Sequence, residues 1–265
     1  MYDSVVVNGI SSNTVTGLAV LSVGLPLLQN IEYDLATVPG ALISVRSSTG
    51  QVKPVEIPIE VAVIGANTEQ VRTRWKAAAR FFANGRLLQV PDAPGDYYVG
   101  YVKGIKLGDE KTTWLKGTVT FVANPPCACR SLGSGLIPAL DTPIPEQLTD
   151  SNATCIKNFT AAGSMPSVSE NGAYPPAVHL AVAGSFTRLV LGGAGGITID
   201  YQAIADTVYV DTERMTVYRK NNGSRISLSG QTSGSFEAVA AQAGALPISG
   251  TGLNIAVRML VTEHG

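Results

Sequence analysis

The feature that most constrains this chain is the segment Val52–Gly65, in which apolar residues alternate with other residues. Alternate side chains of a β-strand point to the same face, so one set of them should face a hydrophobic core. The segment therefore predicts a long strand with one buried face. The residues expected on that face are Val55, Ile57, Ile59, Val61 and Val63.

Two prolines, Pro54 and Pro58, stand on the other face of this expected strand. Proline has no backbone N–H, and residues four apart direct their backbone groups to the same lateral side of a strand. A central strand with two such gaps would lose two hydrogen bonds from one ladder. We therefore expect residues 54–58 to lie at a sheet edge or at a crossing of segments.

One amphipathic helix is expected directly after this strand, at about residues 67–84. Asn67 is a favourable N-cap, and Gln70 stands at the capping-box position. Apolar residues recur at helical spacing along one stripe, which favours contact of Trp75 and Phe82 with the neighbouring sheet. The basic residues lie mostly off that stripe, where we expect solvent or an interface: Arg72, Arg74, Lys76 and Arg80.

A proline-rich turn and a hairpin complete the first half of the chain. Pro91 and Asp92 begin a run of turn-forming residues, and Tyr97 and Tyr98 then open a strand. The prolines after Asn124 cannot donate to a β ladder, so we expect the hairpin to end there. The hairpin strands are expected at 97–107 and 112–123, and the domains at 1–131 and 132–265.

The second half of the sequence predicts an antiparallel β-sandwich. Residues 132–150 are rich in small and turn-forming residues and have weak periodicity, which is typical of a linker or an arm. From Pro175 onward, short apolar strands recur at short intervals and are separated by turn signals. The whole chain is therefore expected to be mainly β, with one long helix in its first domain.

Composition argues against several classes of function. A formal net charge of -1 and 15% charged residues offer no excess of basic residues for nucleic acid or anionic membranes. The most apolar run, residues 17–28, is interrupted and too short to span a bilayer, so no membrane insertion is expected. The N-terminus lacks the basic region of a secretory signal. Three cysteines and two histidines lack metal-binding spacing, so neither a disulfide framework nor a metal site is expected.

No motif predicts catalysis or a cofactor. The glycine-rich run 192–196 is followed by a strand-like pattern, whereas a phosphate site needs a helix N-terminus there. Asp211 and Glu213 flank an expected turn, and paired carboxylates can serve glycoside hydrolysis, but acidic residues are common at turns. There is no Gly-x-Ser-x-Gly elbow, and two histidines make a triad hard to assemble. We expect a protein that is not an enzyme.

Carbohydrate binding by the second domain is an open alternative, because β-sandwiches often bind sugars on exposed aromatic side chains. Both tryptophans, Trp75 and Trp114, lie in the first domain. We expect two of the remaining tyrosines, Tyr209 and Tyr218, to pack on strands. The tyrosine candidates of the second domain are Tyr174, Tyr201, Tyr209 and Tyr218.

The order and spacing of these features resemble the distal tail protein (Dit) family of long, non-contractile-tailed phages. The turn at 39–43 departs from the family pattern, since many relatives carry more glycine there. Downstream, residues 170–176 and 210–213 resemble strands of the family's galectin-like second domain. The residues that carry the resemblance in the first domain are Val7-Asn8-Gly9, Thr37–Gly40, Pro54–Gly65, Trp75, Phe81, Phe82, Leu87, Leu88, Pro91, Asp92, Tyr97, Tyr98, Val119–Phe121 and Asn124–Pro126.

The resemblance implies a structural protein of the virion, located at the tail tip and made in the host cytoplasm. In this family the N-terminal "belt" domains form a hexameric ring, one or two to a tail, and the galectin-like domains project outward. The ring connects the tail tube protein to the tail-tip, tail-associated or baseplate proteins used in host adsorption. A host-adhesion module that binds cell-wall glycan and a tail-tube subunit are the alternatives.

Within this interpretation, eight residues are candidates for packing or for an interface. The prolines at 54 and 58 would mark an unpaired strand edge beside the next subunit or a crossing segment. No catalytic, cofactor-binding or metal-binding residue is expected. The candidates are Pro54, Pro58, Trp75, Phe82, Pro91, Asp92, Tyr97 and Tyr98.

Overall fold

The computed structural model divides into two compact units, residues 1–128 and 129–265, and each unit has its own hydrophobic core. The division falls after residue 128, where the sequence suggested a domain boundary after residue 131. The structure describes residues 4–25, 31–32, 35–36, 45–46, 51–52, 54–91, 93, 95–125, 127–132, 136, 138–139, 142–168, 172 and 174–264.

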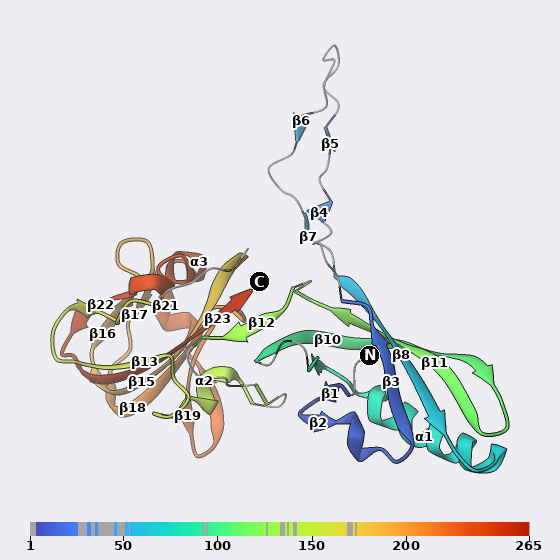
Figure 1. Cartoon of the computed structure of the whole chain (residues 1–265). Coiled ribbons are helices and arrows are strands. Elements are labelled where there is room, and N and C mark those ends of the chain that lie inside the picture. The colour runs from blue at the N-terminus through green and yellow to red at the C-terminus, as the bar shows by residue number, and fades with distance from the viewer. Residues whose placement is uncertain are drawn as a thin grey trace. The chain divides into compact units, whose positions relative to one another are not determined.

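The first unit contains antiparallel strands in the order β2-β1-β9-β10-β11-β8-β3. Figure 1 shows β3, β8 and β11 side by side. Four further short strands pair among themselves, β4 with β7 and β5 with β6. The strand bounds are β1 Val6–Val7, β2 Ile10–Ser11, β3 Leu18–Val23, β4 Ile31–Glu32, β5 Leu35–Ala36, β6 Val45–Arg46, β7 Gln51–Val52, β8 Val55–Ile64, β9 Leu87–Gln89, β10 Asp96–Glu110 and β11 Trp114–Ala123.

Strand β8 has the two faces that its alternating sequence predicts. Ile57, Ile59 and Val63 are at most 1% exposed, whereas Glu56 and Glu60 on the opposite face are exposed. β11 pairs with β8 over its whole length, and Phe121 lies opposite Ile57 in this register. The shared core also takes residues from β1, β3, β9 and the helix, so β8 and β11 are the centre of the first unit.

Helix α1, Thr68–Ala83, begins as its capping sequence predicts. The Asn67 side chain accepts a hydrogen bond from the backbone N–H of Gln70 at 2.9 Å. The Gln70 side chain in turn accepts one from the Ala66 backbone N–H. This reciprocal arrangement satisfies N–H groups that the first helical turn leaves without intrahelical partners.

Helix α1 lies very close to β11 where Trp75 meets Gly117. A Cβ atom at Gly117 would be 2.3 Å from Cη2 of the Trp75 indole and 2.7 Å from the Lys106 carbonyl oxygen. Trp75 is partly buried against the core, and Phe82 is 1% exposed within it. The absence of a side chain at Gly117 therefore lets the helix pack onto the sheet.

The second unit is an antiparallel sandwich whose core contains residues of both sheets. One sheet has β12 Cys129–Ser131, β13 Cys155–Phe159, β15 Tyr174–Phe186, β18 Ala203–Asp211, β19 Thr216–Asn221, β20 Ser224–Ser227 and β23 Asn254–His264. The other has β14 Gly163–Ser164, β16 Arg188–Leu191, β17 Ile197–Ile199, β21 Thr232–Ser233 and β22 Pro247–Thr251.

The expectation of a mainly β chain is confirmed. Two short helices that the sequence did not indicate, α2 Ile144–Gln147 and α3 Phe236–Ala240, occur in the second unit. Each is about one turn long, which is too short to produce a readable helical period.

The Gly117–Trp75 contact predicts that Gly117→Ala destabilises the first unit. The added methyl group cannot move away from the indole without meeting the Lys106 backbone, and overpacking of this kind costs about 1–3 kcal/mol. Gly104→Ala in β10 is the matched control, because nothing lies within 4 Å of a Cβ there. Urea unfolding of both variants measures the difference, and equal free energies of unfolding would refute the packing account.

Candidate functional site

Within the described ranges, β8 is paired along only part of its second side. On its second side, β8 pairs with β3 only from Ile59 to Val63. Just beyond that ladder, the Gly24 backbone N–H donates to the Pro58 carbonyl at 2.8 Å. Among the described residues, no strand pairs with Val55–Ile57 on this side.

The missing donors of the two prolines face this open side. The N–H and C=O groups of one strand residue point the same way, and the Pro58 carbonyl points toward Gly24. Pro54 lies four residues before Pro58, so its backbone groups point to the same side. The ladder between β8 and β11 therefore loses no hydrogen bond to either proline. A Cβ at Gly24 would lie 2.7 Å from Cγ of Pro58, so the proline ring occupies the space beside the chain there.

Charged residues line the exposed face of the same strand. Glu56 bonds to Lys103 of β10, and this contact raises the pKa of the Lys103 ammonium. Glu60 accepts a hydrogen bond from the Ser22 hydroxyl at 2.9 Å. Both side chains of the Glu56–Lys103 pair are more than half exposed, so solvent screens the attraction.

The remaining residues chosen from the sequence are not gathered at one place in the fold. Tyr97 is 1% exposed, and Tyr98 packs partly buried against the core of the first unit. Pro91 is exposed in the turn that precedes β10, and Asp92 lies outside the described residues. Exposure therefore leaves Pro54, Pro58 and Pro91 accessible for contact with a partner.

The described part of segment 132–150 packs on its own unit. Ile144 and Leu148 are buried against Ala181 and Leu260 on the outer face of the sheet that contains β15 and β23. Between them, the Glu146 carboxylate accepts hydrogen bonds from Lys220, at 2.8 Å, and from Arg225. Burial raises the pKa of the Glu146 carboxyl, but these bonds outweigh it and hold that pKa below its usual range.

Asp211 and the acidic residues that precede it in sequence, Asp200 and Asp206, have separate partners. Asp200 pairs with Arg188 and Asp206 with Arg219, at 3.3 and 3.6 Å. Asp211 is buried beside His179. Burial raises the pKa of the Asp211 carboxyl, but His179 and the Arg214 backbone N–H hold that pKa below its usual range. The contacts of Asp200 and Asp206 are ion pairs within the sandwich.

The glycine-rich run 192–196 is a hairpin connection, as its sequence indicated. It joins β16 to β17, with Leu191 opposite Ile197. Gly192, Gly193 and Gly195 have positive φ, a conformation that tight turns require and that glycine adopts readily. A strand follows the run, so it does not have the helix N-terminus of a phosphate site.

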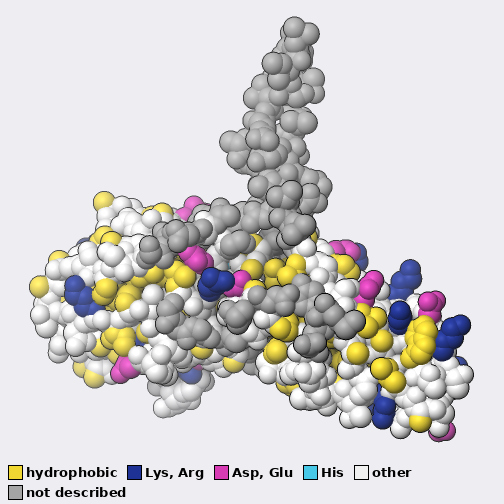
Figure 2. Space-filling view, viewed as in Figure 1, with side chains coloured by type: hydrophobic (Ala, Val, Ile, Leu, Met, Phe, Trp, Pro, Cys, Tyr) yellow, Lys and Arg dark blue, Asp and Glu magenta, His cyan; other side chains and the backbone are white. Residues whose placement is uncertain are grey.

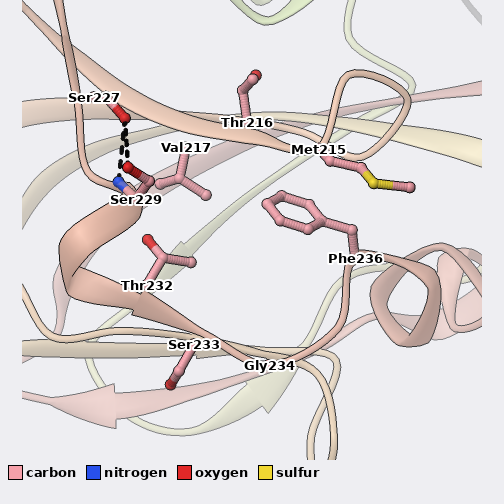
Figure 3. A pocket seen from close by; sticks show the side chains of 9 residues that line it. All are labelled: Met215, Thr216, Val217, Ser227, Ser229, Thr232, Ser233, Gly234 and Phe236. Atoms are coloured by element: carbon pink, nitrogen blue, oxygen red, sulfur yellow. Dashed lines mark hydrogen bonds between the residues drawn. The ribbon is translucent and has the colours of Figure 1, made fainter.

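A small pocket opens in the second unit beside the β19–β20 hairpin (Figure 3). Its volume is about 150 Å³, and its lining carries five hydroxyl groups and no charged side chain. The Phe236 ring from the start of α3 points toward Met215 and Val217 in this view. The lining residues are Met215, Thr216, Val217, Ser227, Ser229, Thr232, Ser233, Gly234 and Phe236.

Sequence reasoning missed Phe236 as an aromatic candidate and chose tyrosines that the fold uses elsewhere. Tyr209 stacks on Tyr218, whose side chain is buried, and the Tyr201 hydroxyl donates to Asp206 at 2.8 Å. The Tyr174 side chain lies outside the described residues. The sequence signal that could have indicated Phe236 is the segment 227–236, in which serine and threonine residues precede a single phenylalanine.

The visible surface carries charges of both signs close together (Figure 2). Hydrophobic side chains lie among uncharged groups on the same face, in keeping with the low proportion of charged residues. No helix in the described part of the chain is long and apolar enough to cross a membrane.

Comparison with known proteins gives a match in fold. No protein-family model and no curated protein matches the sequence. The Dit protein of phage SPP1 (gp 19.1) is similar over 98% of both chains, with 15% identity and a TM-score of 0.64. That protein is described as a paradigm of the hub adsorption apparatus in phages that infect Gram-positive bacteria. A chain of the phage P2 baseplate in its activated conformation with Ca gives 11% identity, covers 95% of this chain and 92% of that one, and has a TM-score of 0.49.

The chain therefore has a Dit-like fold, which confirms the fold that the sequence resemblance implied. The conclusion rests on the SPP1 protein, because the second TM-score lies below 0.5. At 15% identity, this match supports the architecture alone. Assembly and partners therefore have to be argued from this chain's own residues.

The hydrogen bonds that Lys220 and Arg225 donate to Glu146 predict that the free energy of unfolding depends on pH. The folded-state pKa is depressed, so the stabilisation is present above the usual value of 4.5 and is lost as pH falls through the folded value. Glu146→Gln should lower the free energy of unfolding at pH 7 by about 1–3 kcal/mol and flatten its dependence on pH below about 4.5. Urea unfolding between pH 3 and 7 measures both effects. Asp109→Asn, at an exposed carboxylate, is the control, and the account fails if the two variants behave alike.

Proposed function

We propose that this chain is a structural protein of a phage tail tip and that six copies form a closed ring. The ring connects the tail tube to the tail-tip or baseplate proteins used in host adsorption. The observation that carries the proposal is the similarity in fold to the SPP1 hub protein over 98% of both chains. In this proposal the first unit makes the ring, as a belt domain, and the galectin-like second unit projects from it.

The open side of β8 supports ring formation by the first unit. Within the part of the chain that the structure describes, no strand pairs with Val55–Ile57 on this side, and Pro54 and Pro58 offer no backbone N–H there, so the segment is poorly suited to ladder pairing with a strand it meets. Side chains of Glu56 and the exposed prolines are instead available to contact a specific neighbour. Contact between two different surfaces of one subunit generates a ring when the rotation closes and a filament when it does not.

The distribution of carboxylates supports a role without catalysis. A glycosidase holds two carboxyl groups about 5–9.5 Å apart on either side of a substrate cleft. Asp200 and Asp206 are engaged with Arg188 and Arg219, and Asp211 is 1% exposed. Ion pairing thus accounts for Asp200 and Asp206, and burial in the sheet accounts for Asp211.

The proposal predicts that the purified chain assembles and that the β8 edge controls assembly. Light scattering should give a mass near six chains, or twelve for paired rings, and electron microscopy should show closed rings. Pro54→Glu places a second carboxylate beside Glu56 at the edge and should weaken assembly about tenfold or more. Its melting temperature as a dissociated subunit should be that of the unmodified chain, because Pro54 is exposed.

Pro166→Glu is the matched control, since it changes an exposed proline of the second unit in the same way. A monomer at high concentration, with no rings in micrographs, would overturn the ring. Open tubes would favour the tail-tube alternative. Equal assembly of the Pro54 and Pro166 variants would remove the β8 edge from the interface while leaving the ring itself standing.

Glycan binding by the second unit is the second candidate, and the pocket around Phe236 favours it. An uncharged lining with many hydroxyl groups and one aromatic ring matches a neutral sugar, which offers both hydroxyl groups and an apolar C–H face. Ser227 and Ser229 are already mutually hydrogen-bonded at 3.0 Å, so they are held in place before a ligand arrives.

This candidate predicts that neutral cell-wall oligosaccharides bind the full chain and that Phe236→Ala reduces the binding at least about tenfold. Saturation-transfer NMR at millimolar oligosaccharide detects the contact. Tyr101→Ala is the control, because Tyr101 is an aromatic residue of the first unit with 55% exposure. Absence of signal with the unmodified chain would remove glycan binding at this pocket.

A further inference from the structure

The second unit contains a buried imidazole between two carboxylates, on the face of its sheet that points away from the core. His179 of β15 lies opposite Asp211 of β18 in the ladder. Their neighbours Val178, Leu180 and Val210 point into the sandwich core. The side chains of His179 and Asp211 therefore project to the other face, where they are 0% and 1% exposed.

The two nitrogens of the His179 ring approach different carboxylates. Nδ1 lies 3.3 Å from Oδ1 of Asp211, and Nε2 lies 3.9 Å from Oε2 of Glu213. Neither nitrogen makes a hydrogen bond of normal geometry within the described residues. A fully buried polar group without a hydrogen bond is costly, so the arrangement requires a partner for this ring.

The distance between Nε2 and Glu213 is too long for a hydrogen bond and suits a bridging ion. Charge-assisted N–H···O bonds measure about 2.7–2.9 Å, so a proton bridges 3.9 Å poorly. A metal ion with bonds of about 2.0–2.2 Å sets two tetrahedral ligand atoms about 3.4 Å apart, and opposed ligand atoms about 4.2 Å apart. The observed separation falls between these two limits.

The backbone fixes this arrangement in place. The Val178 backbone N–H donates to the Thr212 hydroxyl at 2.8 Å, and the Thr212 N–H donates to the Val178 carbonyl at 3.1 Å. This reciprocal pair ties the residue before Glu213 to the residue before His179. The Arg214 N–H donates to Oδ1 of Asp211 at 3.1 Å, which orients that carboxylate toward the ring.

We propose that Nε2 of His179 and the Glu213 carboxylate bind a divalent transition-metal ion, Zn²⁺ by preference, with Asp211 as the carboxylate that orients the imidazole. Metal-binding histidines usually direct their second ring nitrogen to a carboxylate in this way. Imidazole and carboxylate together suit Zn²⁺, whereas Mg²⁺ and Ca²⁺ prefer oxygen ligands throughout.

Access to the ion comes from the Glu213 side, because its side chain is 34% exposed. Glu213 also lines a pocket of about 420 Å³, whose lining includes Glu237 and His264. Water from the pocket can complete the coordination. One ligand atom from each of His179, Asp211 and Glu213 lies within 4.8 Å of the others.

The ion would join the strands that carry its ligands. Glu213 is in the turn after β18, and His179 is in β15, so a bound metal adds a cross-link between neighbouring strands of the second unit. This role is independent of the proposed ring function, since either property can hold without the other.

Zn²⁺ titration of the untagged, chelator-treated full chain tests the proposal. Calorimetry should show one strong site per chain, and scanning calorimetry should show a Zn²⁺-dependent rise in melting temperature that Mg²⁺ and Ca²⁺ do not produce. Glu213→Gln should weaken Zn²⁺ binding at least about tenfold, and Asp211→Asn about 10–100-fold. Glu213→Gln changes a partly exposed side chain, so this variant keeps the test decisive even where His179→Gln fails to fold.

Two controls separate this site from other metal-binding groups. Asp200→Asn, at a carboxylate paired with Arg188, should bind Zn²⁺ as the unmodified chain does. Cys155→Ser removes a half-buried thiol, whose pKa is raised by burial to about 11, and should also leave binding unchanged. Absence of binding at millimolar Zn²⁺ overturns the proposal. Binding that survives Glu213→Gln, or that is lost in Cys155→Ser, overturns it as well.

Discussion

The first unit depends on the uninterrupted ladder between β8 and β11. All ten residues of β8 have a partner in β11, and the two prolines leave that ladder intact because their missing donors face the other side. The register sets Ile57 opposite Phe121 and Ile59 opposite Val119, which builds the core. It also places Gly117 under Trp75, where the helix closes on the sheet. A slip of one residue would turn these apolar side chains to solvent, so the ladder, the core and the helix position form one cooperative unit.

Local periodicity predicted those elements whose physical causes are local. The alternation of β8 and the Asn67 cap each act within a few residues, and the structure reproduces both. The short helix α2 could not be predicted in this way, because Glu146 is held by Lys220 and Arg225, more than seventy residues away in the chain. Its segment lacks a period since ion pairing and two buried residues, Ile144 and Leu148, fix it to the sheet.

The candidate sites also depend on contacts between residues that are far apart in sequence. Cysteine and histidine spacing indicated no metal site, but spacing along the chain describes only ligands that are neighbours in sequence. His179 and Asp211 are register partners of adjacent strands, 32 positions apart in sequence. Phe236 was missed because aromatic candidates were chosen by residue type, whereas the fold decides which aromatic ring lines a pocket. Tyr218 is 6% exposed and serves packing.

The acidic residues separate by the partner that the fold gives them. Glu146, Asp200 and Asp206 each face a guanidinium group, so their charge is balanced within the chain. Glu213 faces an imidazole at a distance that a hydrogen bond does not span, with solvent on its other side. Among the described residues, Glu56 of β8 is paired with the exposed Lys103. Carboxylates paired with arginine stabilise the fold. In the two proposals made above, Glu213 contributes a ligand to an ion and Glu56 lies at the contact with a neighbouring copy.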